Sequence, residues 1–327
     1  DLPRKIREGR ELDIITCGAC LQGCLAKVKE GGPIGCIVNP ELGHEIDRPL
    51  AAAALGERLV VVGGGPAGME AAVTARRAGL SVTLLERRGS LGGQFTLAPL
   101  TAGKEAMERP LRSMINAVEQ SGVEIRTAVD ATVDTILGLE PDHVVIATGS
   151  RPITPPIPGL ADPLTAEQVL TGAREPGTRV LILGGGLVGI EMAEHLGLAG
   201  HEVVVVELLS DVARDMEAVT RKMVLKRLET LPVAVLESTR LVSMKDDQAV
   251  VAATDDGRER SLGAFDSVLV AVGQSSFDPL SEELQARGLS VTVVGDAFEP
   301  RQIIDATRSG RDAVESIVYQ TGRSSGE

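Results

Sequence analysis

Residues 58–86, RLVVVGGGPAGMEAAVTARRAGLSVTLLE, contain the pattern that decides the fold. A short apolar run leads into a glycine-rich turn and a stretch of helix-forming residues, which Gly79 ends before a second apolar run. Both runs are apolar enough to be buried, so we expect both strands in a parallel sheet that is covered on both faces. The stretch therefore predicts a β-α-β unit.

The turn has the spacing G-x-G-x-x-G, formed by Gly63, Gly65 and Gly68. In such a turn the first glycine bends the chain, the second lets a pyrophosphate approach the backbone, and the third lets the helix pack against the strand. The helix N-terminus then offers free N–H groups to the phosphates. Glu86 ends the second apolar run, where a carboxylate binds ribose hydroxyls. These four residues predict a dinucleotide site.

The same pattern returns about 121 residues later, in RVLILGGGLVGIEMAEHLGLAGHEVVVVE at 179–207. One glycine motif alone is weak evidence, and glycine-rich turns also occur for structural reasons or bind a purely structural nucleotide. Two complete β-α-β frames with an acid at the same offset are much more specific. The second predicted dinucleotide site consists of Gly184, Gly186, Gly189 and Glu207.

Glu207 also indicates which nicotinamide cofactor binds. A carboxylate at this position pairs with a free 2′-hydroxyl and repels a 2′-phosphate. Leu208 and Leu209 follow it, and no arginine stands beside them. The sequence therefore favours NADH over NADPH.

Composition limits the class of protein. The chain has 327 residues, is 43% hydrophobic and carries a net charge of −13, which fits two globular domains and argues against nucleic-acid and membrane partners. It has 37 glycines, no Trp, one Tyr and four Phe, a mixture suited to α/β layers with an aliphatic core. We find no apolar run long enough for a membrane span and no signal-peptide pattern. Because all four cysteines lie in one tight cluster, we expect a reducing, cytoplasmic location.

All four cysteines lie in CGACLQGCLAKVKEGGPIGC, at 17–36, as Cys17-x2-Cys20-x3-Cys24-x11-Cys36. A tight cluster in an otherwise cysteine-free chain does not resemble a secreted disulfide framework. Four thiolates suit zinc or an iron–sulfur cluster. Zinc sites usually have two knuckles of x2 spacing, whereas a cluster accepts uneven spacing because each cysteine binds a separate iron. The spacing leaves both metals open.

Other segments predict a helix within 103–121, a proline-rich connection at 151–163, a helix near 215–230, hairpin-like strands at 233–253 and a final helix near 303–320. The histidines are scattered, and we find no Ser-His-Asp arrangement. We therefore assign no catalytic side chain. The four histidines are His44, His143, His195 and His201.

The two tandem motifs resemble the two-dinucleotide-binding flavoproteins, in which the first site binds FAD and the second NAD(P)H. LGGQ at 91–94, VVIATGS at 144–150, VLVAVG at 268–273 and VGDA at 294–297 extend the resemblance. It implies that Gln94 and Asp296 contact FAD. There is no cysteine pair after the first glycine turn, and 31 residues follow Asp296, which distinguishes the chain from disulfide reductases with a dimerisation domain.

With the cysteine cluster directly before an FAD motif, the chain resembles the 2,4-dienoyl-CoA reductase and trimethylamine dehydrogenase family. CIVNP at 36–40, GGQF at 92–95 and GDAFEPR at 295–301 are similar as well. The resemblance implies that Cys17, Cys20, Cys24 and Cys36 hold a [4Fe–4S] cluster. Family members carry an FMN-binding TIM barrel ahead of the cluster, and LPRKIREGRELDI at 2–14 resembles its last turn. We therefore expect part of a hetero-oligomer or of a longer chain.

The resemblance implies an α/β fold of two Rossmann-like domains plus an N-terminal, loop-rich iron–sulfur segment. We expect this segment at 1–50, the FAD domain at 51–172 and 276–327, and the NAD(P)H domain at 173–275. The implied function is an NAD(P)H-dependent oxidoreductase module that passes electrons from NADH through FAD and [4Fe–4S] to FMN of a barrel. Two alternatives are an amine-dehydrogenase module that runs from FMN through the cluster to an external carrier, with ADP or FAD bound, and a non-catalytic scaffold.

Overall fold

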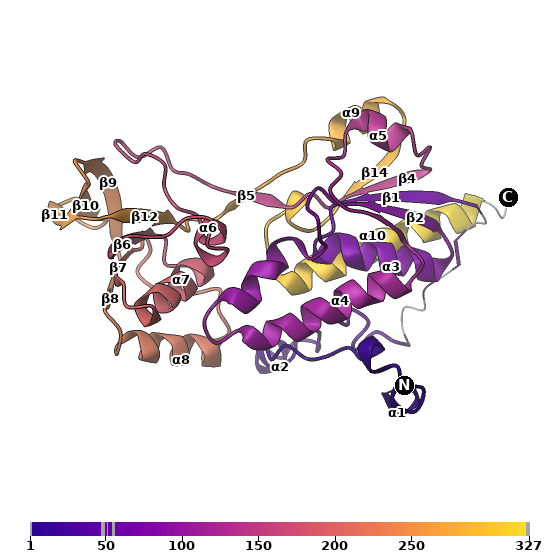
Figure 1. Ribbon diagram of the computed structural model, residues 1–327, viewed down its shortest axis with the longest axis horizontal. Helices are drawn as coiled ribbons and strands as arrows, with labels where there is room; N and C mark the ends of the chain where they lie inside the picture. Colours follow the sequence, from indigo (N-terminus) through magenta and orange to yellow (C-terminus); the bar gives the residue numbers. More distant parts are fainter. Residues whose placement is uncertain (1, 47–49, 51, 54–55, 325–327) are drawn as a thin grey trace. The chain divides into compact units, whose positions relative to one another are not determined.

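The computed structural model describes residues 2–46, 50, 52–53 and 56–324. The chain forms two compact units, which we describe separately (Figure 1). The first unit consists of Asp1–Ala98, Ala106–Arg151 and Ser275–Glu327, and the second of Pro99–Glu105 and Pro152–Gln274. The domain boundary expected between 50 and 51 involves residue 51, which lies outside the described residues.

A five-stranded parallel sheet, in the order β14-β4-β1-β2-β3, forms the centre of the first unit. The β-α-β unit predicted from 58–86 is present as β1, α3 and β2, and Gly79 ends α3 in the left-handed region at φ +103°. The bounds are β1 Arg58–Val62, α3 Pro66–Ala78, β2 Ser81–Leu85, β3 Glu124–Arg126, β4 His143–Ile146 and β14 Ser290–Val293.

Both faces of this sheet are covered, as the apolar character of the two runs predicts. Alternate residues of β1 explain the two layers, because Val61 packs with α3, α4 and α10 and Val60 packs with α5 and α9. Figure 1 shows the two groups of helices on opposite sides of the strands. The helices are α4 Glu108–Gln120, α5 Val133–Leu137, α9 Ser281–Ala286 and α10 Ile303–Ser324.

The N-terminal segment is loop-rich, as expected, with α1 Leu2–Arg7, η1 Glu11–Asp13 and α2 Leu25–Lys29. It joins the core of the first unit through Ile37, which is 1% exposed. Arg311 of α10 anchors it as well, because its buried guanidinium binds Glu41 Oε1 at 2.6 Å and Glu315 Oε1 at 2.7 Å. The cysteine segment therefore packs on the first unit.

The second unit has a four-stranded parallel sheet in the order β12-β6-β7-β8. Helix α7 covers one face of this sheet, and a three-stranded antiparallel sheet, β11-β10-β9, covers the opposite face. The bounds are α6 Ala166–Leu170, β6 Arg179–Leu183, α7 Leu187–Leu198, β7 Glu202–Val206, α8 Ala218–Leu228, β8 Val233–Leu236, β9 Thr239–Lys245, β10 Gln248–Ala253, β11 Glu259–Ala264 and β12 Ser267–Val270.

One sequence expectation in this unit is wrong. We expected hairpin-like strands throughout 233–253, but β8 pairs in parallel with β7 and belongs to the central sheet. The hairpin begins later, between β9 and β10, where Asp246 and Asp247 take positive φ values of 48° and 63°. Positive φ at two central residues is what a two-residue hairpin turn requires.

Two short strands outside these sheets pair with each other, β5 Ser150–Pro152 and β13 Gln274–Ser276. The chain leaves the first unit after Arg151 and returns to it at Ser275, within these strands. The stretch that follows β5 is an irregular connection up to α6, in agreement with its five prolines between 152 and 163.

Candidate nucleotide and metal sites

The first glycine turn is held by close backbone packing. Gly63 has φ +107°, and a Cβ there would lie 2.2 Å from the carbonyl oxygen of Ala147. A Cβ on Gly68 would lie 1.9 Å from the carbonyl oxygen of Gly63, so the helix approaches the turn as closely as the fingerprint predicts. Gly65 differs, because a Cβ there would meet nothing closer than 4.0 Å. The space beside Gly65 therefore leaves room for a ligand to contact the backbone.

Glu86 is 6% exposed and both of its carboxylate oxygens accept backbone hydrogen bonds. Oε2 accepts from the N–H of Gly64 at 2.6 Å, and Oε1 accepts from the N–H of Arg88 at 2.7 Å. Each oxygen has a second lone-pair site, so the carboxylate keeps acceptor capacity for ribose hydroxyls. The backbone thus fixes the orientation of Glu86 beside the glycine turn.

The second turn repeats this geometry. Gly184 has φ +99°, and a Cβ on it would lie 2.4 Å from the carbonyl oxygen of Ala271. Glu207 is 9% exposed, and its oxygens accept from the N–H groups of Gly185 at 2.5 Å and Leu209 at 2.7 Å. The two sites therefore match at the level of individual hydrogen bonds.

The remaining glycines of the second turn match as well. A Cβ on Gly189 would lie 1.9 Å from the carbonyl oxygen of Gly184, as Gly68 does with Gly63 in the first unit. Gly186 is the N-cap of α7, and a Cβ there would meet nothing within 4 Å. Packing therefore does not require a glycine at this position, whereas a ligand that touches the backbone would.

The two residues assigned to FAD by resemblance alone lie in one hydrogen-bonded chain. Gln94 Nε2 donates to the carbonyl and hydroxyl oxygens of Ser150, both at 3.2 Å, and the Ser150 hydroxyl donates to Asp296 Oδ2 at 3.1 Å. Burial raises the pKa of Asp296, and hydrogen bonds from the Arg301 N–H and the Ser150 hydroxyl partly offset it. Sequence reasoning missed Ser150, although it ends the quoted VVIATGS.

Close backbone contact brings two of the cysteines together. The N–H of Gly35 donates to the carbonyl oxygen of Gly23 at 2.7 Å, so Cys24 and Cys36 each follow a residue of this contact. A Cβ on Gly23 would lie 2.5 Å from the backbone of Gly35, so a side chain there would separate the two segments. The glycine next to Cys17 is as confined, because a Cβ on Gly18 would lie 2.6 Å from the ring of Pro110 on α4.

The backbone around Cys20 is unusual. Ala19 and Leu21 on either side have φ of +55° and +61°, a region that non-glycine residues rarely occupy. The N–H of Ala19 donates to Cys17 Sγ at 3.3 Å. Burial raises the pKa of the Cys20 thiol, and the neighbouring Cys36, Cys24 and Cys17 raise it further. The other three thiols therefore lie within electrostatic range of Cys20.

Cys20 and Cys36 pack against the core of the first unit, while Cys17 and Cys24 are exposed. Within the described residues, no group of three or more His, Cys, Asp or Glu side chains surrounds a position for a single metal ion. A cluster has a different requirement, because each cysteine binds a different iron. The structure places the four sequence-predicted cysteines in one region of the first unit.

Comparison with known proteins decides the family. Residues 57–292 match the pyridine nucleotide-disulphide oxidoreductase family. The chain belongs to this family. NADH oxidase of Thermoanaerobacter brockii is 37% identical over 318 residues, which cover 94% of this chain and 48% of the relative. The homologues confirm the resemblance to the 2,4-dienoyl-CoA reductase and trimethylamine dehydrogenase family.

Solved structures agree with the oxidoreductase fold. A 2-naphthoyl-CoA reductase in complex with 2-naphthoyl-CoA has a TM-score of 0.89 at 30% identity, over 97% of this chain and 48% of that chain. Histamine dehydrogenase from Rhizobium sp. 4-9 has a TM-score of 0.85 at 26% identity, over 97% and 50%. The present chain thus spans about half the length of these oxidoreductases.

Two partly buried ion pairs on α7 were not expected from the sequence. Lys104 forms an ion pair with Glu191. Burial raises the pKa of Glu191, and the Lys104 ammonium offsets part of this increase. Arg227 of α8 binds Glu194, which is 4% exposed. Glu191 lies one turn into α7, the helix that follows the second glycine turn. Its partner Lys104 is distant in the sequence, so only the tertiary structure reveals this ion pair.

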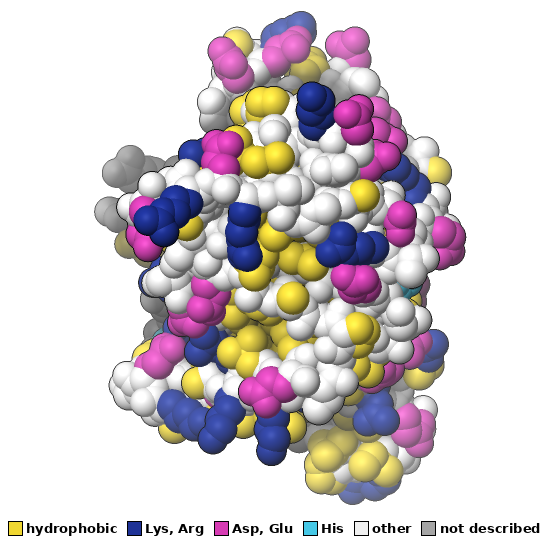
Figure 2. Space-filling view, turned by 90° about the vertical axis from the view of Figure 1, so that its left-hand side faces the viewer, with side chains coloured by type: hydrophobic (Ala, Val, Ile, Leu, Met, Phe, Trp, Pro, Cys, Tyr) yellow, Lys and Arg dark blue, Asp and Glu magenta, His cyan; other side chains and the backbone are white. Residues whose placement is uncertain are grey.

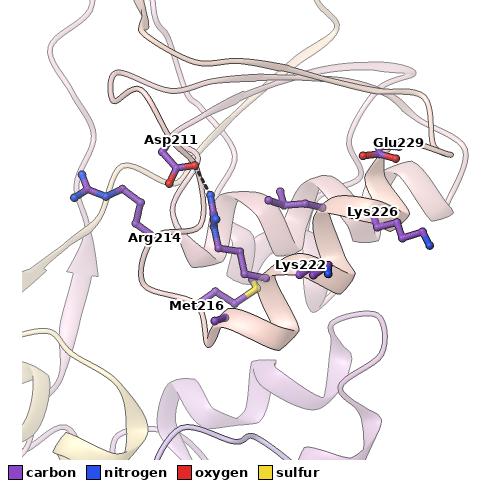
Figure 3. A pocket seen from close by; sticks show the side chains of 9 residues that line it. Asp211, Arg214, Met216, Lys222, Lys226 and Glu229 are labelled. Carbon is purple, nitrogen blue, oxygen red and sulfur yellow. Dashed lines mark hydrogen bonds and ion pairs between the residues drawn. The ribbon is translucent and has the colours of Figure 1, made fainter. Parts of the chain in front are cut away.

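A pocket lies along α8, with Met216 and Leu225 among its lining residues (Figure 3). Arg221 is tied to Asp211, while Arg214 extends away from Lys222 and Lys226. Figure 2 shows positive and negative side chains interspersed on the face that it presents.

No helix among the described residues has both the length and the apolar character needed to cross a membrane.

Proposed function

We propose that the chain is an NADH-dependent electron-transfer module that passes electrons from NADH through FAD and a [4Fe–4S] cluster to FMN of a barrel subunit or domain. The observation that carries this is the presence, in one chain, of two matched nucleotide frames and a four-cysteine segment packed on the first of them. The family membership supports NAD(P)H and flavin as the redox pair. The cluster and the FMN partner are the further step.

At the FAD site, the chain's part is binding and orientation. Gly63, Gly65 and Gly68 shape the backbone for the pyrophosphate, and Glu86 is oriented for the ribose. Gln94 and Asp296 would contact the cofactor as a pair that Ser150 joins. Asp296 accepts hydrogen bonds from the Ser150 hydroxyl and the Arg301 N–H, and these two contacts fix the orientation of its carboxyl group.

At the nicotinamide site, Gly184, Gly186 and Gly189 shape the turn and Glu207 is oriented for the adenosine ribose. Leu208 and Leu209 are exposed beside it and offer no positive charge for a 2′-phosphate. NADH is therefore the proposed donor. NADH supplies two electrons as hydride, a flavin exchanges one or two, and an iron–sulfur cluster exchanges one at a time.

Cys17, Cys20, Cys24 and Cys36 would hold the cluster. Their fit rests on the Gly23–Gly35 contact, which joins the Cys24 and Cys36 segments, and on the left-handed residues on both sides of Cys20, which turn the short loop. Zinc is less suitable, because zinc sites usually have two knuckles of x2 spacing and only Cys17 and Cys20 have that spacing here. The thiols lie on the N-terminal segment, where the exposed apolar residues Leu12, Ile15 and Ile34 offer a surface for the proposed barrel.

The test is anaerobic reconstitution of the 327-residue chain with iron, sulfide and FAD, followed by iron, sulfide and flavin analysis and titration with NADH. We expect about four irons per chain, bound FAD and bleaching of the flavin absorbance by NADH. The absence of bound FAD, or of NADH-driven bleaching in FAD-loaded protein, would refute the reductase function. Bound zinc without sulfide would refute the cluster alone.

A second candidate runs in the other direction, from FMN of a barrel through the cluster to an external carrier, with ADP or FAD in the first site. The similarity to histamine dehydrogenase, with a TM-score of 0.85, supports this second candidate. Bound ADP in place of FAD, together with no response to NADH, would select this candidate. The intact second glycine turn and Glu207 favour the NADH-dependent direction.

A further inference from the structure

Residues 211–216, which we call the covering loop, lie over the second glycine turn. The N–H of Ala213 donates to the carbonyl oxygen of Gly185 at 2.7 Å. The first unit has the same contact, from the N–H of Gly92 to the carbonyl oxygen of Gly64 at 2.8 Å. Gly92 takes φ +118°, whereas Ala213 takes φ +50°, a conformation that strains a residue with a Cβ. The covering loop is thus the strained counterpart of the Gly92 segment.

The covering loop places a negative charge at the start of α7. Asp215 Oδ1 accepts a hydrogen bond from the N–H of Leu187, the first residue of the helix, at 3.0 Å. In the first unit the corresponding first residue is Pro66, which has no N–H to donate. The nicotinamide site therefore differs from the FAD site by one carboxylate bound at the helix N-terminus.

This carboxylate occupies the end of the helix where the fingerprint binds a pyrophosphate. Asp215 and the dinucleotide phosphates are both anionic and seek the same N–H groups, so they repel and compete. The start of the loop is held separately, because Arg221 donates from Nε to the carbonyl oxygen of Val212 at 2.9 Å and pairs with Asp211. These contacts and the bond from Ala213 to Gly185 do not use the Leu187 N–H, so its release by Asp215 breaks none of them.

We propose that Asp215 sets the affinity of the second site: it caps α7 while the site is free and gives up the Leu187 N–H when the pyrophosphate of NADH binds. This inference rests on the proposed function, because it requires a dinucleotide at this turn. The consequence is weaker binding of both NADH and NAD⁺ than the glycine turn alone would give, which favours release of the product. Asp215 is a positioning residue and takes no part in hydride transfer.

The test measures binding of ADP-ribose, which carries the pyrophosphate but no nicotinamide, to the full chain by calorimetry. Asp215→Asn keeps an oxygen that can accept the Leu187 N–H and removes only the charge. We expect ADP-ribose to bind about three- to tenfold more tightly to this variant, because a neutral amide holds the Leu187 N–H less strongly than a carboxylate does and does not repel the approaching phosphates. Asp215→Ser provides a second uncharged variant if the first folds poorly.

Glu229→Gln is the matched control, because it removes one negative charge from the pocket on α8 without touching the glycine turn. Its affinity for ADP-ribose should equal that of the wild type. Equal or weaker binding by both Asp215 variants would overturn the inference, and so would equal tightening by Glu229→Gln. Failure of wild type and all variants to bind ADP-ribose would instead refute the nicotinamide site itself.

Discussion

Replacing Glu86 with glutamine tests the first nucleotide site most directly. The two carboxylate oxygens accept from two backbone N–H groups, those of Gly64 at 2.6 Å and Arg88 at 2.7 Å. A glutamine amide has one oxygen and one NH₂ group. Whichever way the amide stands, its NH₂ group therefore faces one of the two backbone N–H donors. The substitution keeps the size of the side chain and loses one hydrogen bond in a site that is 6% exposed.

The expected cost follows from the burial. A buried donor left without an acceptor costs about 1–3 kcal/mol, so we expect Glu86→Gln to destabilise the FAD-free chain by about 2 kcal/mol. For a unit of this size that corresponds to a melting temperature lower by about 4–8 °C. FAD binding should weaken further, because the single amide oxygen keeps only one lone-pair site for the ribose where the carboxylate has two. Thermal melting and flavin retention after gel filtration measure the two effects.

Two further variants complete this experiment. Glu207→Gln should produce the same loss of stability in the second unit and weaken ADP-ribose binding while FAD stays bound, because its contacts repeat those of Glu86. Glu202→Gln, at the other end of β7, removes only a surface pair with Arg179 and should change the melting temperature little. Glu86→Gln with wild-type melting temperature and flavin content would refute the assigned role.

Three shorter predictions concern other sites. Gly23→Ala forces the facing backbone away and should lower the iron bound on reconstitution, whereas Gly32→Ala, whose Cβ would meet backbone only at 3.4 Å, should not; full iron binding by Gly23→Ala would contradict the proposed contact. Burial raises the pKa of Asp296 in the folded state, so the buried carboxylate destabilises the fold. This destabilisation is absent below the ordinary carboxyl pKa and reaches its full size above the raised pKa. Asp296→Asn should therefore raise the melting temperature of the FAD-free chain near neutral pH but not at about pH 3, and an equal change at both pH values would exclude the effect. Lys104→Met leaves the Glu191 carboxylate, 12% exposed, without its cation and should lower the free energy of unfolding by about 1–2 kcal/mol, a change that urea denaturation detects and that Lys104→Arg should restore.

Local patterns predicted the parts of this protein that depend on local geometry. The turn at Gly63 and Gly184 needs positive φ and a close carbonyl contact, and glycine spacing records both requirements directly. The expectation for 233–253 is wrong for β8, because the apolar content of a short strand does not reveal whether it pairs in parallel or in a hairpin. The strand that pairs with β8 is β7, which α8 separates from it in the sequence.

The same reason explains which site residues sequence reasoning missed. Ser150 joins Gln94 and Asp296 from a segment 146 residues before Asp296, and no spacing rule relates the three. Lys104 and Glu191 are 87 residues apart, and their ion pair depends on burial, which a sequence does not show. The cysteine spacing, in turn, left zinc open, because the arrangement of the thiols depends on the Gly23–Gly35 contact rather than on the spacing itself.

The duplicated nucleotide units show where similar sequences diverged in chemistry. Both keep the strand, the turn, the helix and an acid with two backbone hydrogen bonds. They differ where Pro66 is replaced by Leu187 and where Gly92 is replaced by Ala213. A site for a cofactor that stays bound gains from an open helix end, whereas a site for a substrate that leaves at every turnover tolerates a competing cap. The added N–H, the strained loop and the carboxylate that it carries are therefore the features that we expect to separate a retained FAD from an exchanging NADH.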